Sequence, residues 1–232
     1  MAFCTNCGGA LGNSQNFCGS CGSKVGTPVA QNTSSSNSVD GFSHYAHAFN
    51  SIFLTKFESV GDIQSFFQGQ KGEELLDKAN SGNPYATLMV SMIYCTEENN
   101  YGKAYQVAEL AMKRAKEAKQ DLGQYWFGYG FALEQVERFE DALEAHENAL
   151  ELGFGEAAFN LGRVLLTQNA DLPNAIKSWK VGRDKFGSRT CAEMLEDLET
   201  ESGVYSASIQ MPDGRTEILY YSDRPGGLGT FK

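Results

Sequence analysis

The sequence lacks an excess of basic residues, a long apolar segment and a signal peptide. Its 232 residues include 19 Lys and Arg against 29 Asp and Glu, which gives a formal net charge of −10. An acidic chain without a basic stripe does not favour nucleic acid or anionic membranes as partners. No apolar run approaches the roughly 20 residues that span a bilayer, and the N-terminus has neither a charged n-region nor an apolar h-region. We therefore expect a soluble, cytoplasmic protein with no membrane association.

The sequence also lacks the short motifs of common enzymes. It contains no Walker motif, no Gly-x-Ser-x-Gly, no His-Glu-x-x-His and no dinucleotide fingerprint. An enzyme would have to use the histidines or a ladder of glutamates that includes Glu144. Such a ladder at helical spacing usually faces water, and His146 occupies a position where a packing role is expected. Cys95 and Cys191 are single cysteines, which favours buried free thiols. We predict a non-enzymatic protein.

Two closely spaced pairs of cysteines stand near the N-terminus. Cys4 and Cys7 form one Cys-x-x-Cys pair, Cys18 and Cys21 form another, and ten residues separate the two pairs. Four thiolates can surround one Zn²⁺ in a closed tetrahedral site with no open position for a substrate. A disulfide pair, a redox Cys-x-x-Cys and a rubredoxin-like iron site are the alternatives. A module this small has almost no hydrophobic core, which favours a metal, and we predict one structural zinc ion.

The segment 1–26 resembles the short zinc ribbon found at the N-terminus of many prokaryotic proteins. Nucleic-acid-binding ribbons carry lysines and arginines around the metal, but Lys24 is the only charged side chain before Asp40. Four thiolates around Zn²⁺ make the module negative. A structural or protein-docking role is therefore expected, with a nucleic-acid-associated or regulatory factor as the alternative. Residues 27–40 are rich in Ser and Asn without periodicity, which predicts a flexible linker.

The stretch from Tyr125 to Leu152 predicts two antiparallel helices. In the first, Trp126, Tyr129, Gly130 and Leu133 recur at helical spacing. In the second, the apolar stripe contains small alanines where a neighbouring helix must come close; it consists of Phe139, Ala142, Leu143, His146, Ala149 and Leu150.

Similar helix pairs precede and follow this stretch. Ala104, Ala142 and Ala175 occupy equivalent positions 38 and 33 residues apart, which brackets the period of roughly 34 residues of tetratricopeptide repeats. The pattern of Trp126, Gly130 and the later alanines resembles that family, and the segments around Ala86 and Ala157 resemble the related Sel-like repeats. Either resemblance implies a mainly α protein with a right-handed α-solenoid of helix pairs, which we expect over residues 41–201.

Aromatic residues precede the repeats. Phe42, Tyr45, Phe49, Phe53 and Phe57 are spaced as one face of a helix. A capping helix that packs on the first repeat is expected, because terminal repeats need covers. An aromatic groove for a ligand is the alternative.

The C-terminal segment 202–232 changes character. Tyr205, Ala207 and Ile209 alternate in one predicted strand and Ile218 and Tyr220 in a second, with a Pro-Asp-Gly turn between them. We predict a β-hairpin followed by a loop-like tail. Because an isolated hairpin is marginally stable in water, this one is expected to dock on the solenoid or on another chain, and contact with the N-terminal module is a third alternative.

The first helix of each pair lines the concave surface in the repeat families that the chain resembles. A protein or peptide ligand is the expected partner, held by aromatic anchors and polar contacts in this groove. The predicted function is that of a scaffold or adaptor for protein–protein interaction. The candidate contact residues are Met89, Ile93, Gln124, Tyr125, Phe127, Tyr129 and Asn160.

Overall fold

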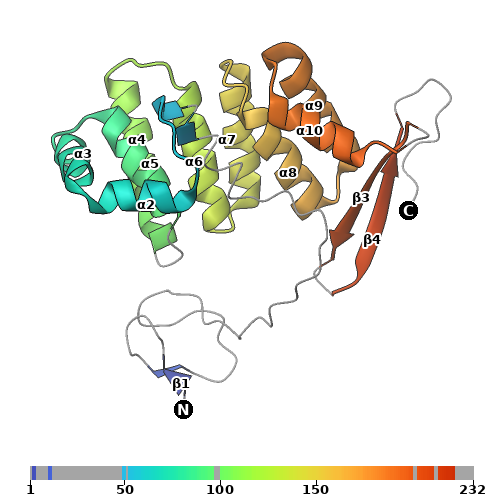
Figure 1. The fold of residues 1–232 in the computed structure, drawn as a ribbon, viewed down its shortest axis with the longest axis horizontal. Helices are drawn as coiled ribbons and strands as arrows, with labels where there is room; N and C mark the ends of the chain where they lie inside the picture. Colours follow the sequence, from blue (N-terminus) through green and yellow to red (C-terminus); the bar gives the residue numbers. More distant parts are fainter. Residues whose placement is uncertain are drawn as a thin grey trace.

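The protein is mainly helical, with a small two-stranded antiparallel hairpin near the C-terminus (Figure 1). A computed structural model describes residues 2–3, 10–11, 49–50, 52–96, 100–200, 203–211 and 214–222. Its helices are α2 (Val60–Gln68), α3 (Gln70–Asn80), α4 (Pro84–Tyr94), α5 (Tyr101–Glu117), α6 (Gly123–Gln135), α7 (Phe139–Glu151), α8 (Ala157–Asn169), α9 (Leu172–Phe186) and α10 (Arg189–Leu198). Its strands are β1 (Ala2–Phe3), β2 (Ala10–Leu11), β3 (Tyr205–Gln210) and β4 (Thr216–Tyr221).

Each helix packs on the next one in the sequence, and the helices follow one another along the long axis of the molecule (Figure 1). The two helices predicted over Tyr125–Leu152 are confirmed as α6 and α7. Those predicted before and after them are confirmed as α4 with α5 and as α8 with α9. None of the described helices is long and apolar enough to cross a membrane.

Side-chain caps fix where several helices begin. The Ser59 hydroxyl accepts a hydrogen bond from the Asp62 N–H (3.2 Å), and the Asp62 carboxylate accepts one from the Ser59 N–H (2.8 Å), which together form a capping box on α2. The Asn83 side chain accepts from the Ala86 N–H (2.8 Å) at the start of α4, where Pro84 occupies the first turn. These residues set the entry points of the first helices in the array.

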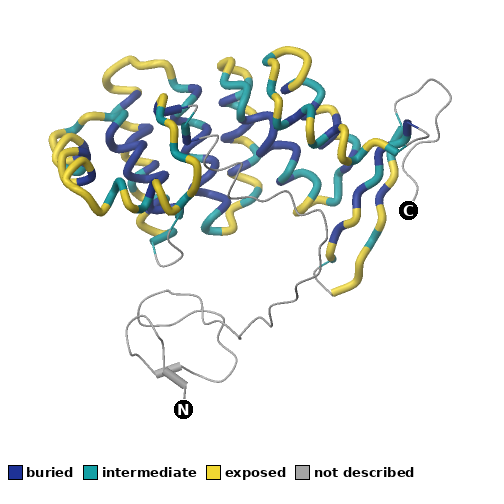
Figure 2. Tube along the Cα trace, viewed as in Figure 1, coloured by how far each residue is buried: buried dark blue, intermediate teal, exposed yellow. Residues whose placement is uncertain are grey.

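Buried residues follow the helices along the whole described array and continue into the hairpin (Figure 2). Most of their side chains belong to two clusters. One extends from Phe49 through α2 to α7 and ends at Ala157, and the other joins α8, α9, α10 and the hairpin. Leu150 on α7 packs against both clusters. The hydrophobic interior therefore continues along the array, and no described helix pair is separated from its neighbour by solvent.

The hairpin docks on the helices as predicted. β3 contacts α8 and α10, and β4 contacts α9. The register pairs Tyr205 with Tyr221 and Ala207 with Leu219, so these four side chains share the face that packs on the second cluster. The alternate residues of β4 face outward, and Ile218 is 53% exposed. Leu219 and Tyr221 therefore form the face of β4 that meets the core, because they pair with the buried residues of β3. Ile218 and Tyr220 lie on the opposite, exposed face.

The aromatic segment before α2 does not continue as one helical face. Phe49 and Phe53 lie in helical turns, but Leu54 adopts a left-handed conformation (φ 51°) and Phe57 lies outside any helix. The reversal at Leu54 folds Phe57 back, and its ring centroid lies 5.9 Å from that of Phe49. The predicted covering role is confirmed for the described residues, because Phe53 contacts Tyr85 of α4 edge to face at 5.1 Å.

Several sequence predictions fall outside the described residues. These are the four cysteines of the predicted zinc ribbon, the predicted linker 27–40, the aromatic residues before Phe49 and the tail after residue 222. Cys95 and Cys191 are described, and both are buried free thiols as predicted.

Gly162 permits the close approach of α8 and α9. A Cβ at this position would lie 2.4 Å from Nε1 of Trp179, a fully buried indole that donates a hydrogen bond to the Phe159 carbonyl (3.1 Å). We expect Gly162→Ala to lower the free energy of unfolding by about 1–3 kcal/mol through this clash. Gly102→Ala is the matched control, because a Cβ there meets nothing within 4 Å on α5, and it should raise stability by about 0.4–1 kcal/mol.

Urea denaturation followed by helical circular dichroism measures both variants. Equal stabilities for the two variants would contradict the packing that is described between Gly162 and Trp179.

Candidate functional site

The N-terminal residues that the structure describes form a short strand pair. β1 and β2 are antiparallel, with Ala2 opposite Leu11 and Phe3 opposite Ala10. In the sequence, Cys4 and Cys7 stand between β1 and β2, and Cys18 and Cys21 follow β2; all four lie outside the described residues. Four thiolates are a donor set that suits Zn²⁺. The part of the chain with described side chains contains no other group of three or more residues that could hold a metal ion.

Most of the residues predicted to line the partner groove are in the core. Five of the seven are buried, namely Met89, Ile93, Tyr125, Phe127 and Asn160. They are buried because the first helices of neighbouring pairs, such as α4 and α6, pack on each other and on their partners. Gln124 and Tyr129 remain partly exposed. Of the seven predicted contact residues, only Gln124 and Tyr129 are therefore accessible at the surface, and the other five belong to the core.

Gln124 lies in a surface cavity of about 420 Å³ at the start of α6, which we call the helix-end cavity. The first turn of α4, the connection between α5 and α6, and the connection between α7 and α8 all contribute to it. Three successive helix pairs thus meet at this point. Its lining residues are Tyr85, Gln120, Asp121, Gly123, Gln124, Leu152, Gly153 and Phe154.

Hydrogen bonds hold the polar groups of the helix-end cavity in place. The Tyr125 hydroxyl, below the cavity, donates to Oε1 of Gln120, and Oδ1 of Asp121 accepts from the Gly123 N–H at 3.0 Å. The Tyr85 hydroxyl donates to the Ile52 carbonyl (3.3 Å). Burial raises the pKa of Tyr85 and of Tyr125 above the usual value of 10, so both remain neutral donors at neutral pH.

The chemistry of the helix-end cavity suits a polypeptide segment. Leu152 is 50% exposed and Phe154 is half-buried, so apolar contact is available to an incoming side chain. The amide of Gln124 can donate to a backbone carbonyl and accept from a backbone N–H. This combination of exposed apolar area with a few placed polar groups is typical of ligand sites.

Tyr129 belongs to a different surface. Its ring stacks on Tyr105 of α5 with a centroid distance of 5.8 Å, and Trp126 contacts it edge to face at 6.2 Å. The Arg138 guanidinium donates to the Tyr105 hydroxyl (2.9 Å) and pairs with Asp141 (2.6 Å). These contacts occupy the faces of the Tyr129 ring. Tyr129 does not line the helix-end cavity, so the structure does not bring Gln124 and Tyr129 together in one groove.

A buried polar cluster joins α6, α7 and α8, and we call it the Glu134 brace. Oε1 of Glu134 lies 2.7 Å from Nε2 of His146, and Oε2 of Glu134 accepts from Arg163. Glu134 is 7% exposed and His146 is fully buried. None of the three residues lines the helix-end cavity, so the brace connects helices instead of presenting groups to a ligand there.

Sequence reasoning gave His146 a packing role but missed Glu134 and Arg163. The available signal was that each is a lone charge in an otherwise apolar helical stretch, in FGYGFALEQ and in AAFNLGRVLL. A lone charge among apolar neighbours requires a partner from another element.

His146 is neutral in the folded protein. Burial lowers its pKa from 6.5 to about 3. The Glu134 carboxylate beside this ring also pairs with the Arg163 guanidinium. Nε2 therefore carries the proton and donates to Glu134. The buried Nδ1 atom has no hydrogen-bond partner among the described residues and lies against Gly130, where a Cβ would come within 2.9 Å of it.

Comparison of the chain with protein-family models, with curated proteins and with solved structures finds no match in any of the three.

The state of His146 makes stability depend on pH. In the unfolded chain the His146 ring binds a proton below about pH 6.5. In the folded protein the ring binds this proton only below about pH 3. The free energy of unfolding should therefore fall by up to about 1.4 kcal/mol per pH unit from this residue as the pH drops through that range. His146→Gln keeps a donor for Glu134 but cannot titrate, so its stability should fall less steeply.

Urea denaturation at pH 7, 6 and 5 compares the slopes. Glu144→Gln, at an exposed position on the same helix, should retain the wild-type slope. Identical slopes for the wild type and His146→Gln would show that the ring is protonated in the folded state.

Proposed function

We propose that the protein is a non-enzymatic interaction adaptor. In this proposal a structural zinc ribbon is joined by the segment 27–40 to a right-handed α-solenoid of helix pairs, and the solenoid binds a protein or peptide segment. The chain organisation supports this assignment, because successive helices pack on one another in sequence order and share continuous hydrophobic clusters. Such arrays offer an extended surface and are widely used to hold other polypeptides.

The helix-end cavity is the observation that carries the proposal. It opens where the ends of three helix pairs converge, and it combines the exposed Leu152 with the half-buried Gln124 and Phe154. A single apolar side chain of a partner fits a cavity of this size, and the neighbouring amides match a peptide backbone. The ligand is therefore a polypeptide and not a small charged metabolite, since Asp121 is the only ionisable group among the lining residues besides the neutral Tyr85.

In this proposal Cys4, Cys7, Cys18 and Cys21 hold one Zn²⁺. The sequence spacing supports the assignment, because two Cys-x-x-Cys pairs separated by ten residues supply four thiolates for one tetrahedral ion. The metal would stabilise a module that is too small to form a hydrophobic core. The net charge of −10 and the scarcity of basic residues around the cysteines favour protein over nucleic acid as the partner.

Metal analysis tests the ribbon. Purified full-length protein should contain about one zinc ion per chain. A variant that combines Cys4→Ser and Cys7→Ser should lose the zinc ion and keep the helical circular dichroism, because the described helices do not involve these residues. Cys95→Ala, at a buried thiol of the helical region, should retain the metal. Protein that is prepared reduced and without chelator but carries no metal would refute the assignment.

Affinity capture with surface variants tests the helix-end cavity. Leu152→Glu places a charge on its apolar wall, and the recovery of a specific partner should fall by at least about tenfold, as expected for the loss of an apolar anchor worth about 1.5–3 kcal/mol. Leu110→Glu is the matched control, because Leu110 is a 40% exposed leucine on α5 that does not line the cavity.

Quantitative mass spectrometry compares the wild type, the two leucine variants and the cysteine variant. A partner that survives Leu110→Glu but not Leu152→Glu supports the proposal. Equal recovery with both leucine variants would contradict it, and salt-labile recovery of nucleic acid that depends on the cysteines would establish the alternative ribbon function.

A further inference from the structure

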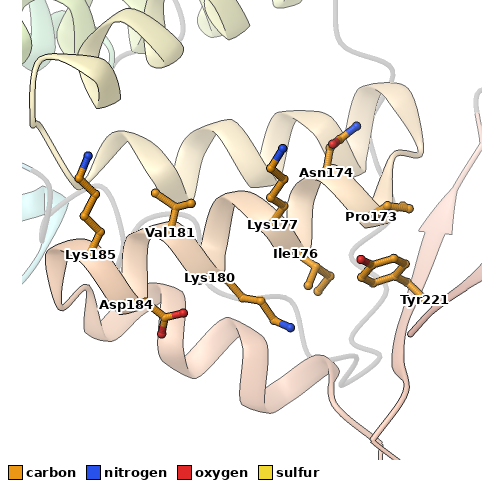
Figure 3. A pocket seen from close by; sticks show the side chains of 9 residues that line it. All are labelled: Pro173, Asn174, Ile176, Lys177, Lys180, Val181, Asp184, Lys185 and Tyr221. Carbon is orange, nitrogen blue, oxygen red and sulfur yellow. The ribbon is translucent and has the colours of Figure 1, made fainter. Parts of the chain in front are cut away.

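A second cavity of about 420 Å³ runs along one face of α9 (Figure 3). All but one of its lining residues come from α9, where they form four adjacent pairs that recur every three or four positions along one side of the helix. Tyr221 of β4 points into the cavity and closes one end (Figure 3). We call this surface the α9 groove, and its lining residues are Pro173, Asn174, Ile176, Lys177, Lys180, Val181, Asp184, Lys185 and Tyr221.

The α9 groove has an apolar floor. Ile176 is only 1% exposed, and Val181 and Pro173 are half-buried. The half-buried ring of Tyr221 stacks on Tyr205 of the neighbouring strand (6.5 Å), which holds the end wall in position. A short apolar side chain can therefore be covered on several sides without any movement of the backbone.

Three lysines surround this floor. Figure 3 shows Lys177 and Lys185 along one side and Lys180 on the other. The Lys180 ammonium lies 4.9 Å from the centre of the Tyr205 ring, which keeps the charge close to the end wall. The chain as a whole carries a net charge of −10, so this concentration of positive charge is a local feature that composition does not explain.

The one acid in the α9 groove is already paired. Oδ1 of Asp184 lies 2.6 Å from Nε of Arg183, and this hydrogen bond lowers the pKa of the carboxyl group below 3.8. Asp184 therefore remains charged and is matched by an arginine that does not line the groove. Among the described residues no ion pair involves Lys177 or Lys185. Lys177 and Lys185 therefore give the groove positive charge that an acidic ligand can meet.

We propose that the α9 groove binds an acidic peptide segment that carries an apolar anchor. The anchor lies against Tyr221 beside Pro173 and Ile176 (Figure 3), and neighbouring carboxylates approach Lys177 and Lys185. From Pro173 to Lys185 the helix rises about 18 Å, which matches about five or six residues of extended chain. This site is independent of the helix-end cavity, because the two share no lining residue.

The groove favours a peptide over a nucleic acid. Its positive groups are all lysines, while Arg183 is engaged by Asp184. Lysine binds phosphate as a point charge, whereas the bidentate contacts with phosphate come from arginine. The buried Ile176 and the half-buried Val181 and Pro173 suit an aliphatic side chain instead. A second copy of the chain is a poorer occupant, because the acidic outer face of α7 carries no exposed apolar residue except Leu152 at its end.

Fluorescence anisotropy with synthetic peptides and the full-length protein tests this proposal. The probe is a labelled peptide with a central leucine and several glutamates on each side. Two matched peptides replace either the leucine by serine or the glutamates by lysines. We expect each replacement to weaken binding by at least about tenfold, since the first removes the anchor and the second reverses the charge.

Two charge-reversal variants identify the site. Lys177→Glu combined with Lys185→Glu should weaken binding of the acidic probe by at least about tenfold. Lys71→Glu combined with Lys113→Glu changes the net charge equally at exposed positions of α3 and α5, and it should retain binding within about twofold. Circular dichroism confirms that both variants fold.

Three results would overturn the proposal. The first is no binding of the acidic probe by folded wild-type protein, and the second is an equal loss in both pairs of variants, which would mean unspecific attraction. The third is lysine-dependent binding of a single-stranded oligonucleotide without binding of the peptide. The Leu152→Glu variant should bind the acidic probe like the wild type, so failure at the helix-end cavity is distinguishable from failure at the α9 groove.

Discussion

The carboxylate of Glu134 is the constraint on which the middle of the molecule depends. A charge in a protein interior requires partners, and its two oxygens receive one donor from α7 and one from α8. The distances between α6, α7 and α8, and the rotation of each helix about its own axis, must therefore keep both hydrogen bonds to Glu134 in place. The helix-end cavity lies at the other end of α6, where its first residues meet the connection between α7 and α8. Buried ionic groups often add little net stability, but they exclude alternative packings in which they would be unpaired.

Much of the fold was predictable from the sequence because its signals are local. The apolar spacing in Tyr125–Leu152 predicts α6 and α7, and the alternation before and after the Pro-Asp-Gly turn predicts β3 and β4. The burial of Cys95 and Cys191 followed from the absence of partner cysteines near them. In each case a pattern within a short stretch of sequence predicts the helix, the strand or the buried residue, and the structure has it at that place.

The sites were less predictable because they depend on distant residues. Met89 and Tyr125 have the apolar character of contact residues, but packing between helix pairs buries them. The brace joins Glu134 to residues 12 and 29 positions away, and no local pattern specifies such a pairing. The α9 groove requires Tyr221 from the hairpin, whose docking position is a property of the tertiary structure. Similarly, the aromatic spacing before α2 could not reveal the reversal at Leu54.

The docked hairpin covers the last helices that the structure describes. Tyr205, Ala207 and Leu219 belong to the hydrophobic cluster that also contains residues of α8, α9 and α10. Water is therefore excluded from the apolar side of these helices by a later part of the same chain. A chain cut before β3 would expose this apolar surface, and exposed apolar surface of this kind promotes association with other proteins.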